Sequence, residues 1–105
     1  MIELSYYKNK DVGILGAGIS GLAAAKFLLN SNANIHIFDD NKDKPQNIKK
    51  ENWKNYRLWP WKSLTTLVVS PGIPLNAKTQ HTAIHLAKKN KVKIINEIDL
   101  FVETK

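Results

Sequence analysis

Near its N-terminus the chain reads Asp11-Val12-Gly13-Ile14-Leu15-Gly16-Ala17-Gly18-Ile19-Ser20-Gly21. The segment 11–15 has the apolar character of a short buried strand, and the glycines after it have the spacing G-x-G-x-x-G. The next segment, 19–30, is rich in Ala and Leu and predicts a helix that ends in a polar turn. A strand, a glycine loop and a helix in this order indicate the first unit of a nucleotide-binding α/β fold.

Each glycine of the loop has its own expected task. Gly16 makes the tight turn out of the strand, Gly18 lets the backbone approach a phosphate, and Gly21 lets the helix pack close to the sheet. The amides of Gly18, Ile19 and Ser20 then face an anion, which the positive end of the helix dipole also attracts. The plainer alternative is a glycine turn that only packs.

Working outward from this unit, further strands are predicted over 33–39, 56–59, 65–70 and 91–95, and a second helix over 79–90. The polar segment 40–52 reads as a loop or a poorly packed short helix. Strands that alternate with helices imply a parallel sheet with right-handed crossovers. The expected fold is therefore α/β and Rossmann-like: a doubly wound, mainly parallel sheet of five strands in a single domain over residues 1–105.

An acidic residue ends the second predicted strand. Asp39 follows Gly21 at close to the spacing of ~20 residues at which a carboxylate meets the ribose or base of a bound nucleotide. The glycine loop is also preceded by a predicted strand and followed by a predicted helix. Together with this acid, these elements favour nucleotide binding over a loop that merely packs.

A second turn, Ser70-Pro71-Gly72, follows the strand predicted over 65–70. In a doubly wound sheet this strand lies beside the first strand, on the side away from the second, so the turn faces Gly18 across the crevice where ligands bind. Pro71 fixes the chain direction, Gly72 permits a left-handed or close-approach conformation, and Ser70 offers a hydroxyl and an amide. By residue chemistry alone, a plain strand-to-helix turn explains these residues equally well.

Composition excludes several classes of protein. The formal charge of +7 comes from lysines spread along the chain and a single Arg57, which we interpret as a solvated surface that attracts anions weakly. No apolar run approaches the ~20 residues that span a bilayer, and the N-terminus has no basic leader, so we expect a cytoplasmic protein with no membrane partner. The absence of cysteine excludes disulfides and thiolate metal sites.

Two weaker patterns compete with nucleotide binding. His81 and His85 stand one helical turn apart, but the Glu and third ligand of a zinc motif are missing, so we expect no metal. Residues 53–62 interleave aromatic and basic side chains, a pattern that could stack the bases of single-stranded nucleic acid. The commoner explanation is that Trp59 or Trp61 covers one edge of the sheet, and we expect no nucleic-acid partner.

Four motifs, in their order and spacing, resemble the N-terminal domain of the Mur ligase family, in its branch of UDP-N-acetylmuramoyl-L-alanine:D-glutamate ligases. They are Gly16-Ala17-Gly18-Ile19-Ser20-Gly21, Phe38-Asp39-Asp40-Asn41, Val69-Ser70-Pro71-Gly72-Ile73-Pro74-Leu75 and Ile94-Ile95-Asn96-Glu97-Ile98-Asp99-Leu100-Phe101. The resemblance runs the length of the chain. Its specificity rests on the last two motifs, because many unrelated nucleotide-binding proteins share the first.

The resemblance implies that this domain holds the UDP end of UDP-N-acetylmuramoyl-L-alanine during bacterial peptidoglycan synthesis. The implied binding residues fall into a diphosphate group, a uracil group and a group lining the same pocket: Gly18, Ile19 and Ser20; Asp39, Asp40 and Asn41; Ser70, Pro71 and Gly72. Family members often have Thr and then Arg after the strand-ending Asp. This chain has Asp40 and Asn41 there, which add no cation.

The sequence contains no P-loop of the form G-x-x-x-x-G-K-[ST], and no His and Glu set that could hold catalytic magnesium. We therefore expect an excised domain that has no catalytic residues, binds no cofactor and is inactive on its own. We also expect it to be a monomer. The resemblance assigns ATP and Mg to the parent enzyme, whose central ATPase and C-terminal domains are absent here. In the parent, ATP phosphorylates the substrate carboxylate and the D-glutamate amine attacks the acyl phosphate.

Two other functions stay open on the sequence. One is an FAD- or NAD-binding fragment of an oxidoreductase, since the segment 16–28 fits such a helix. Flavin enzymes of that type usually end the second strand with Glu rather than Asp39, and nothing in that class requires the turn at Ser70. The other is a non-catalytic nucleotide-sensing module.

Overall fold

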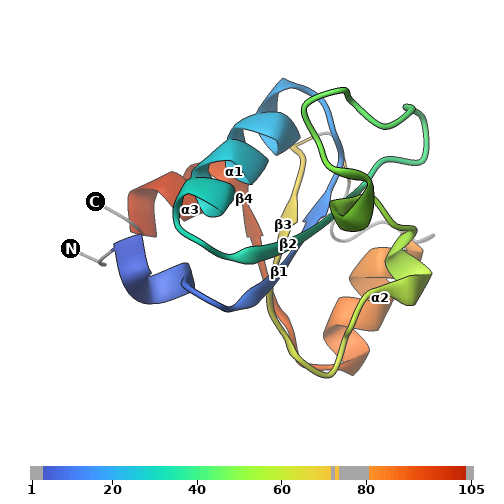
Figure 1. Ribbon diagram of the computed structural model, residues 1–105. Coiled ribbons are helices and arrows are strands. Elements are labelled where there is room, and N and C mark those ends of the chain that lie inside the picture. Colours follow the sequence, from blue (N-terminus) through green and yellow to red (C-terminus); the bar gives the residue numbers. More distant parts are fainter. Residues whose placement is uncertain (1–3, 72, 74–80, 104–105) are drawn as a thin grey trace.

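The computed structural model describes residues 4–71, 73 and 81–103, and its described part is a sheet covered by helices on both faces (Figure 1). The strands are β1 (Asp11–Leu15), β2 (Asn34–Phe38), β3 (Leu64–Val69) and β4 (Lys93–Asn96). The helices are α1 (Ile19–Asn30), α2 (Thr82–Lys89) and α3 (Glu97–Glu103). The predicted α/β class is confirmed.

The strand order is β2-β1-β3-β4, and every pair of neighbours is parallel. The chain passes from β1 to β2 on one side and then returns to place β3 on the other side of β1. The order therefore reverses between β1 and β3, as predicted, and a crevice forms beyond their carboxyl ends.

The prediction of five strands is wrong: the sheet of the described residues has four. The segment predicted as a strand over 56–59 is a 3-10 turn, η3 (Tyr56–Leu58), because its aromatic rings turn inward to fill the core. Along the outer edge of β2, Ile37 forms an isolated parallel bridge with Trp53, and the Asn52 side-chain amide donates a hydrogen bond to the Ile35 carbonyl.

The boundaries of α2 and β4 also differ from the predicted ranges. Helix α2 begins at Thr82, because His81 caps it, and residues 79 and 80 of the predicted helix lie outside the described part. Strand β4 begins at Lys93 rather than at Lys91, whose left-handed backbone (φ 58°) turns the chain from α2 into the strand.

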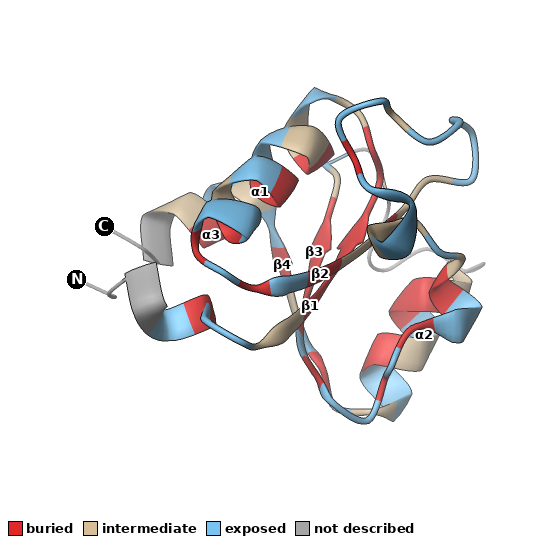
Figure 2. Ribbon diagram, in the orientation of Figure 1, coloured by how far each residue is buried: buried red, intermediate tan, exposed pale blue. Residues whose placement is uncertain are grey.

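Two buried clusters lie on opposite faces of the sheet, and Figure 2 shows that the strands between them are mostly buried. One cluster joins the sheet to α1 and α3 through residues such as Ile14, Leu28 and Leu100. The other joins it to α2 and the aromatic segment through residues such as Trp59 and Ile84. The core is thus a three-layer arrangement, helix against sheet against helix.

The aromatic segment packs onto a strand residue that has no side chain. A Cβ on Gly13 would lie 2.8 Å from Cζ3 of Trp59, so the indole reaches this depth only over a glycine. Both Trp59 and Trp61 are buried, on a face of the sheet rather than at the predicted edge. Their indole N–H groups donate to the carbonyls of Lys54 and Tyr56 at 2.8 Å.

A reciprocal cap starts α3 directly after β4. The Asp99 amide donates to the Asn96 side chain at 2.8 Å, and the Asn96 amide donates to the Asp99 carboxylate at 3.3 Å. This explains locally why the motif at 96–99 ends a strand and begins a helix. None of the described helices is long and apolar enough to cross a membrane.

Candidate nucleotide-binding cleft

A cleft of about 300 Å³ opens beyond the carboxyl ends of β1 and β3. Its lining comes from the glycine loop, the loop after β2, the turn after β3 and the residue before α2. The lining residues are Leu15, Gly16, Gly18, Asp39, Asp40, Asn41, Lys42, Ser70, Ile73 and His81. Four segments that are distant in sequence therefore meet at the strand ends where an open α/β sheet binds ligands.

The geometry of the glycine loop separates the roles of its glycines. Gly16 has a φ of +109°, as a tight turn requires, and a Cβ there would stand 2.1 Å from the Ser70 Oγ. A Cβ on Gly21 would stand 2.0 Å from the Gly16 carbonyl oxygen, so α1 meets the loop closely only without a side chain. A Cβ on Gly18 would meet nothing within 4 Å, which leaves its backbone open to the cleft.

The Asp39 carboxylate fastens the end of β2 to the glycine loop. Its Oδ2 accepts from the Ala17 amide and its Oδ1 from the Asn41 amide, both at 2.8 Å. Hydrogen bonds from backbone amides to a carboxylate are among the stronger ones in proteins. Asp39 thus lies in the cleft, as the sequence suggests, and it also shapes the walls of the cleft.

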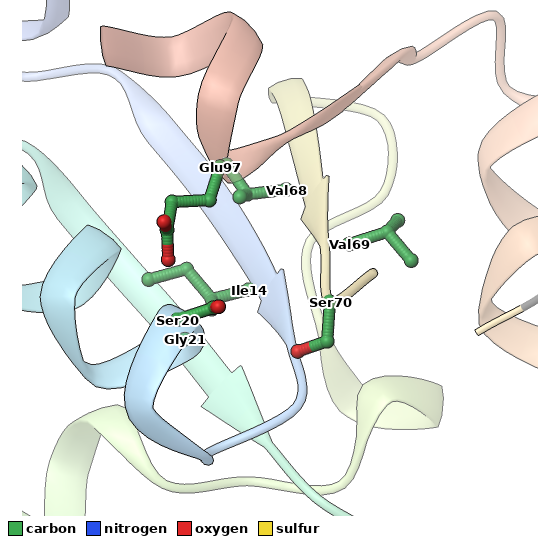
Figure 3. Close-up of a pocket in the computed structure, with 7 residues that line it drawn as sticks. All are labelled: Ile14, Ser20, Gly21, Val68, Val69, Ser70 and Glu97. Atoms are coloured by element: carbon green, nitrogen blue, oxygen red, sulfur yellow. The ribbon is translucent and has the colours of Figure 1, made fainter. Parts of the chain in front are cut away.

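Beside the cleft, Ser20, Ser70 and Glu97 line a narrow crevice that leaves no room for a water molecule. Figure 3 shows the Glu97 carboxylate extending from the start of α3 toward the first turn of α1. Glu97 Oε2 is buried and has no hydrogen-bond partner among the described residues. This crevice is too tight for a ligand, whereas the neighbouring cleft has the required space.

Asp40 is held by two side chains from other segments. The Tyr56 hydroxyl donates to Asp40 Oδ1 at 3.1 Å, and His81 Nε2 lies 2.6 Å from Asp40 Oδ2. Burial raises the pKa of Tyr56 above its ordinary value, and the hydrogen bond to the Asp40 carboxylate raises it further.

The structure brings most of the predicted site residues together. Gly18, Asp39, Asp40, Asn41 and Ser70 line the cleft, and Ser20 lines the adjoining crevice. The Ile19 side chain is 92% exposed at the start of α1, and Pro71 is exposed beside Ser70; neither lines the cleft. Gly72 lies outside the described residues.

Five lining residues were not predicted as binding residues: Leu15, Gly16, Lys42, Ile73 and His81. Lys42 supplies a cation to the lining although the two positions before it, Asp40 and Asn41, do not. Its only sequence signal was its place directly after the acidic end of β2. From the sequence, His81 was considered only together with His85, as a pair for which no metal was expected, and so it was not assigned to the cleft.

A second hollow, of about 370 Å³, is lined by residues of α1 and of the segment 47–48, such as Leu22, Lys26 and Ile48. It is the larger of the two. The cleft is nevertheless the candidate site, because it lies at the carboxyl ends of the strands and joins an open backbone to carboxylates, a hydroxyl and a cation.

Comparison with known proteins identifies the family. The profile of the family described as Mur ligase MurD-like, N-terminal domain, matches residues 10–96. The chain belongs to this family. The matched range of this MurD-like domain contains all four segments that line the cleft.

Full-length relatives of the MurD-like domain are named UDP-N-acetylmuramoylalanine--D-glutamate ligase. The proteins of Bartonella henselae, Wolbachia sp. subsp. Brugia malayi and Agrobacterium fabrum are each 34% identical to it, over 100%, 99% and 97% of this chain. The chain spans only 23%, 22% and 22% of those proteins. The domain therefore corresponds to between a fifth and a quarter of such a ligase.

Proposed function

We propose that this MurD-like domain binds the UDP end of UDP-N-acetylmuramoyl-L-alanine for a ligase that adds D-glutamate to it with ATP, in the cytoplasmic stage of peptidoglycan synthesis. The observation that carries the proposal is the cleft at the switch point between β1 and β3, where Gly18, Asp39 and Ser70 converge. The family and the names of the relatives supply the class of nucleotide.

The diphosphate binds at the N-terminal end of α1. The first helical hydrogen bond runs from the Leu22 amide to the Gly18 carbonyl, so the amides of Ile19 and Ser20 precede the hydrogen-bonded part of the helix. Those amides and the helix dipole favour an anion by about 0.3–1 kcal/mol when exposed, and up to ~2 kcal/mol when partly buried. The open space at Gly18 lets phosphate oxygens approach the backbone.

The uridine binds toward the loop after β2. Carboxylates repel phosphates but accept hydrogen bonds from the N–H and O–H groups of a nucleoside, so Asp39 and Asp40 suit the neutral end of the ligand. Lys42 and the Asn41 side chain add donors for uracil carbonyls. These donors and acceptors favour a nucleotide with its phosphates at the glycine loop and its base at the loop after β2.

ATP and magnesium belong to other parts of the proposed ligase. The sequence has no P-loop, and no magnesium-type carboxylate cluster forms within residues 4–71, 73 and 81–103. The residues of this domain therefore do not fit those groups. Its contribution is to bind and orient the substrate, while acyl-phosphate formation and attack by the D-glutamate amine take place on the rest of the enzyme.

Titration calorimetry with UDP, NAD and FAD tests the proposal on the purified chain. UDP should bind in a one-to-one complex and more tightly than either dinucleotide, since the cleft holds a single nucleotide diphosphate. Tight stoichiometric FAD binding, or NAD binding stronger than UDP binding, would support the oxidoreductase alternative and contradict the proposal.

A further inference from the structure

His81 connects helix α2 to the acidic loop of the cleft. It stands directly before α2, and its Nδ1 accepts a hydrogen bond from the Ala83 amide at 3.0 Å, as an N-cap does. Its Nε2 lies 2.6 Å from Asp40 Oδ2. One imidazole therefore caps a helix with one nitrogen and contacts the cleft with the other.

These two contacts define the tautomer of the ring. An Nδ1 that accepts from a backbone amide carries no proton, so the neutral ring has its proton on Nε2. That Nε2–H then donates to the Asp40 carboxylate. The cap and the carboxylate contact thus support each other, because the first leaves the ring in the only neutral form that satisfies the second.

Tyr56 holds the other oxygen of the same carboxylate. Its hydroxyl donates to Asp40 Oδ1 at 3.1 Å, and its ring meets the His81 ring edge to face, with centroids 4.9 Å apart. Tyr56 itself is anchored in the core at 6% exposure. Asp40 is therefore oriented from two sides, although its own side chain is 42% exposed at the cleft.

We propose that His81 and Tyr56 are positioning residues that orient the Asp40 carboxylate to accept a hydrogen bond from an N–H or O–H donor of the uridine. Asp40 would touch the ligand, whereas His81 and Tyr56 act through Asp40. Each carboxylate oxygen of Asp40 keeps a second lone pair after it accepts a hydrogen bond from His81 or Tyr56. The carboxylate can therefore still accept a hydrogen bond from the ligand. The inference rests on the proposed function and extends it to a specific region of the nucleoside.

The contacts favour this role over a metal site. His85, one turn along α2, is exposed, and no third ligand approaches His81 among the described residues. His81 already uses both ring nitrogens, on Ala83 and on Asp40. A ring committed in this way supports the carboxylate but offers no free lone pair to a cation.

The substitution His81→Asn tests the inference, because Asn is a good helix cap but is too short to reach Asp40 as histidine does. Affinity for uridine and for UDP should fall by the same factor, about three- to tenfold, which is the range for one hydrogen bond. Affinity for pyrophosphate, measured in the same titrations, should not change. His85→Asn, on the exposed side of the same helix, is the matched control and should bind all three ligands normally.

A double-mutant cycle separates action through Asp40 from a general loosening of the cleft. If His81 acts through Asp40, then His81→Asn should cost little further uridine affinity in a chain that already carries Asp40→Asn. Should His81→Asn fail to fold in a thermal melt, Tyr56→Phe replaces it in the cycle, because it removes only the hydroxyl.

Several results would overturn the inference. They are normal uridine affinity in His81→Asn, an equal loss of pyrophosphate affinity, or losses that simply multiply in the double variant. Failure of the proposed function would look different, because the unmodified chain would then bind neither uridine nor UDP. In that case the positioning role falls with the proposed function.

Discussion

Asp39 Oδ2 accepts a hydrogen bond from the Ala17 amide at 2.8 Å, and this contact joins the end of β2 to the glycine loop. The two segments lie side by side because β1 and β2 are paired in parallel, with Leu15 opposite Phe38. An acid at the end of the second strand is usually interpreted as a ligand for ribose. In this domain the carboxylate also fixes the glycine loop, which we propose receives the phosphates.

The substitution Asp39→Asn should therefore lower stability as well as affinity. The amide side chain keeps one acceptor, but it loses the charge and cannot accept from Ala17 and Asn41 as a carboxylate does. We expect the free energy of unfolding to fall by about 1–3 kcal/mol, measured by urea denaturation. Asp43→Asn, in the exposed part of the same loop, is the control and should leave the midpoint unchanged. Equal midpoints for both variants would contradict a structural role for Asp39.

Two glycines of the loop should respond differently to the addition of a methyl group. Gly21→Ala brings a Cβ to 2.0 Å from the Gly16 carbonyl oxygen, so α1 must shift, and we expect a loss of about 1–3 kcal/mol in the free energy of unfolding. Gly18→Ala meets open space and should change stability by less than about 0.5 kcal/mol. Thermal melts of the two variants compare them directly, and similar losses would show that the glycine loop packs differently.

Alkaline pH should destabilise the domain through Tyr56. Its folded-state pKa lies above its ordinary value, first because of burial and then because of the hydrogen bond to Asp40. The stability from the neutral hydroxyl is fully present below the unfolded-state pKa of about 10 and is lost as the pH rises through the folded-state pKa. Urea midpoints should therefore decline less steeply above about pH 10 in Tyr56→Phe than in the unmodified chain. Parallel declines in the two proteins would contradict the direction of the shift.

Phosphate binding at the glycine loop predicts a selective effect of Gly18→Val. The φ of Gly18 is −78°, which any residue adopts, so the valine does not strain the backbone but stands where we propose that the phosphates approach. UDP should lose most of its advantage over uridine, by roughly thirtyfold if the helix end contributes up to ~2 kcal/mol. Uridine affinity should barely change. A folded variant that binds UDP normally would show that the phosphates lie elsewhere.

Much of this architecture could be predicted from local sequence patterns. The range of α1, the strand β1 and the reversal of strand order follow from the glycine spacing and from the apolar runs. The segment around Tyr56 could not be predicted in the same way, because a short run of aromatic and apolar residues suits a strand equally well. The segment forms a turn instead, because Trp59 is buried over Gly13. That contact joins distant parts of the sequence.

The candidate site likewise has one part that could be predicted from the sequence and one part that could not. The glycine loop, Asp39 and Ser70 stand at the ends of predicted strands, where topology alone brings them together. The contribution of His81 depends on its contact with Asp40, a partner 41 residues away in the sequence. No spacing rule links such a pair, so the structure was needed to recognise it.

Amide NMR spectra of the isotope-labelled chain during a UDP titration test the central claim most directly. The account predicts saturable shifts that are largest at the amides of Gly18, Ser20, Asn41 and Ser70, around the cleft beyond β1 and β3. Shifts confined to the hollow at Leu22, Lys26 and Ile48, or no saturable shifts, would contradict it.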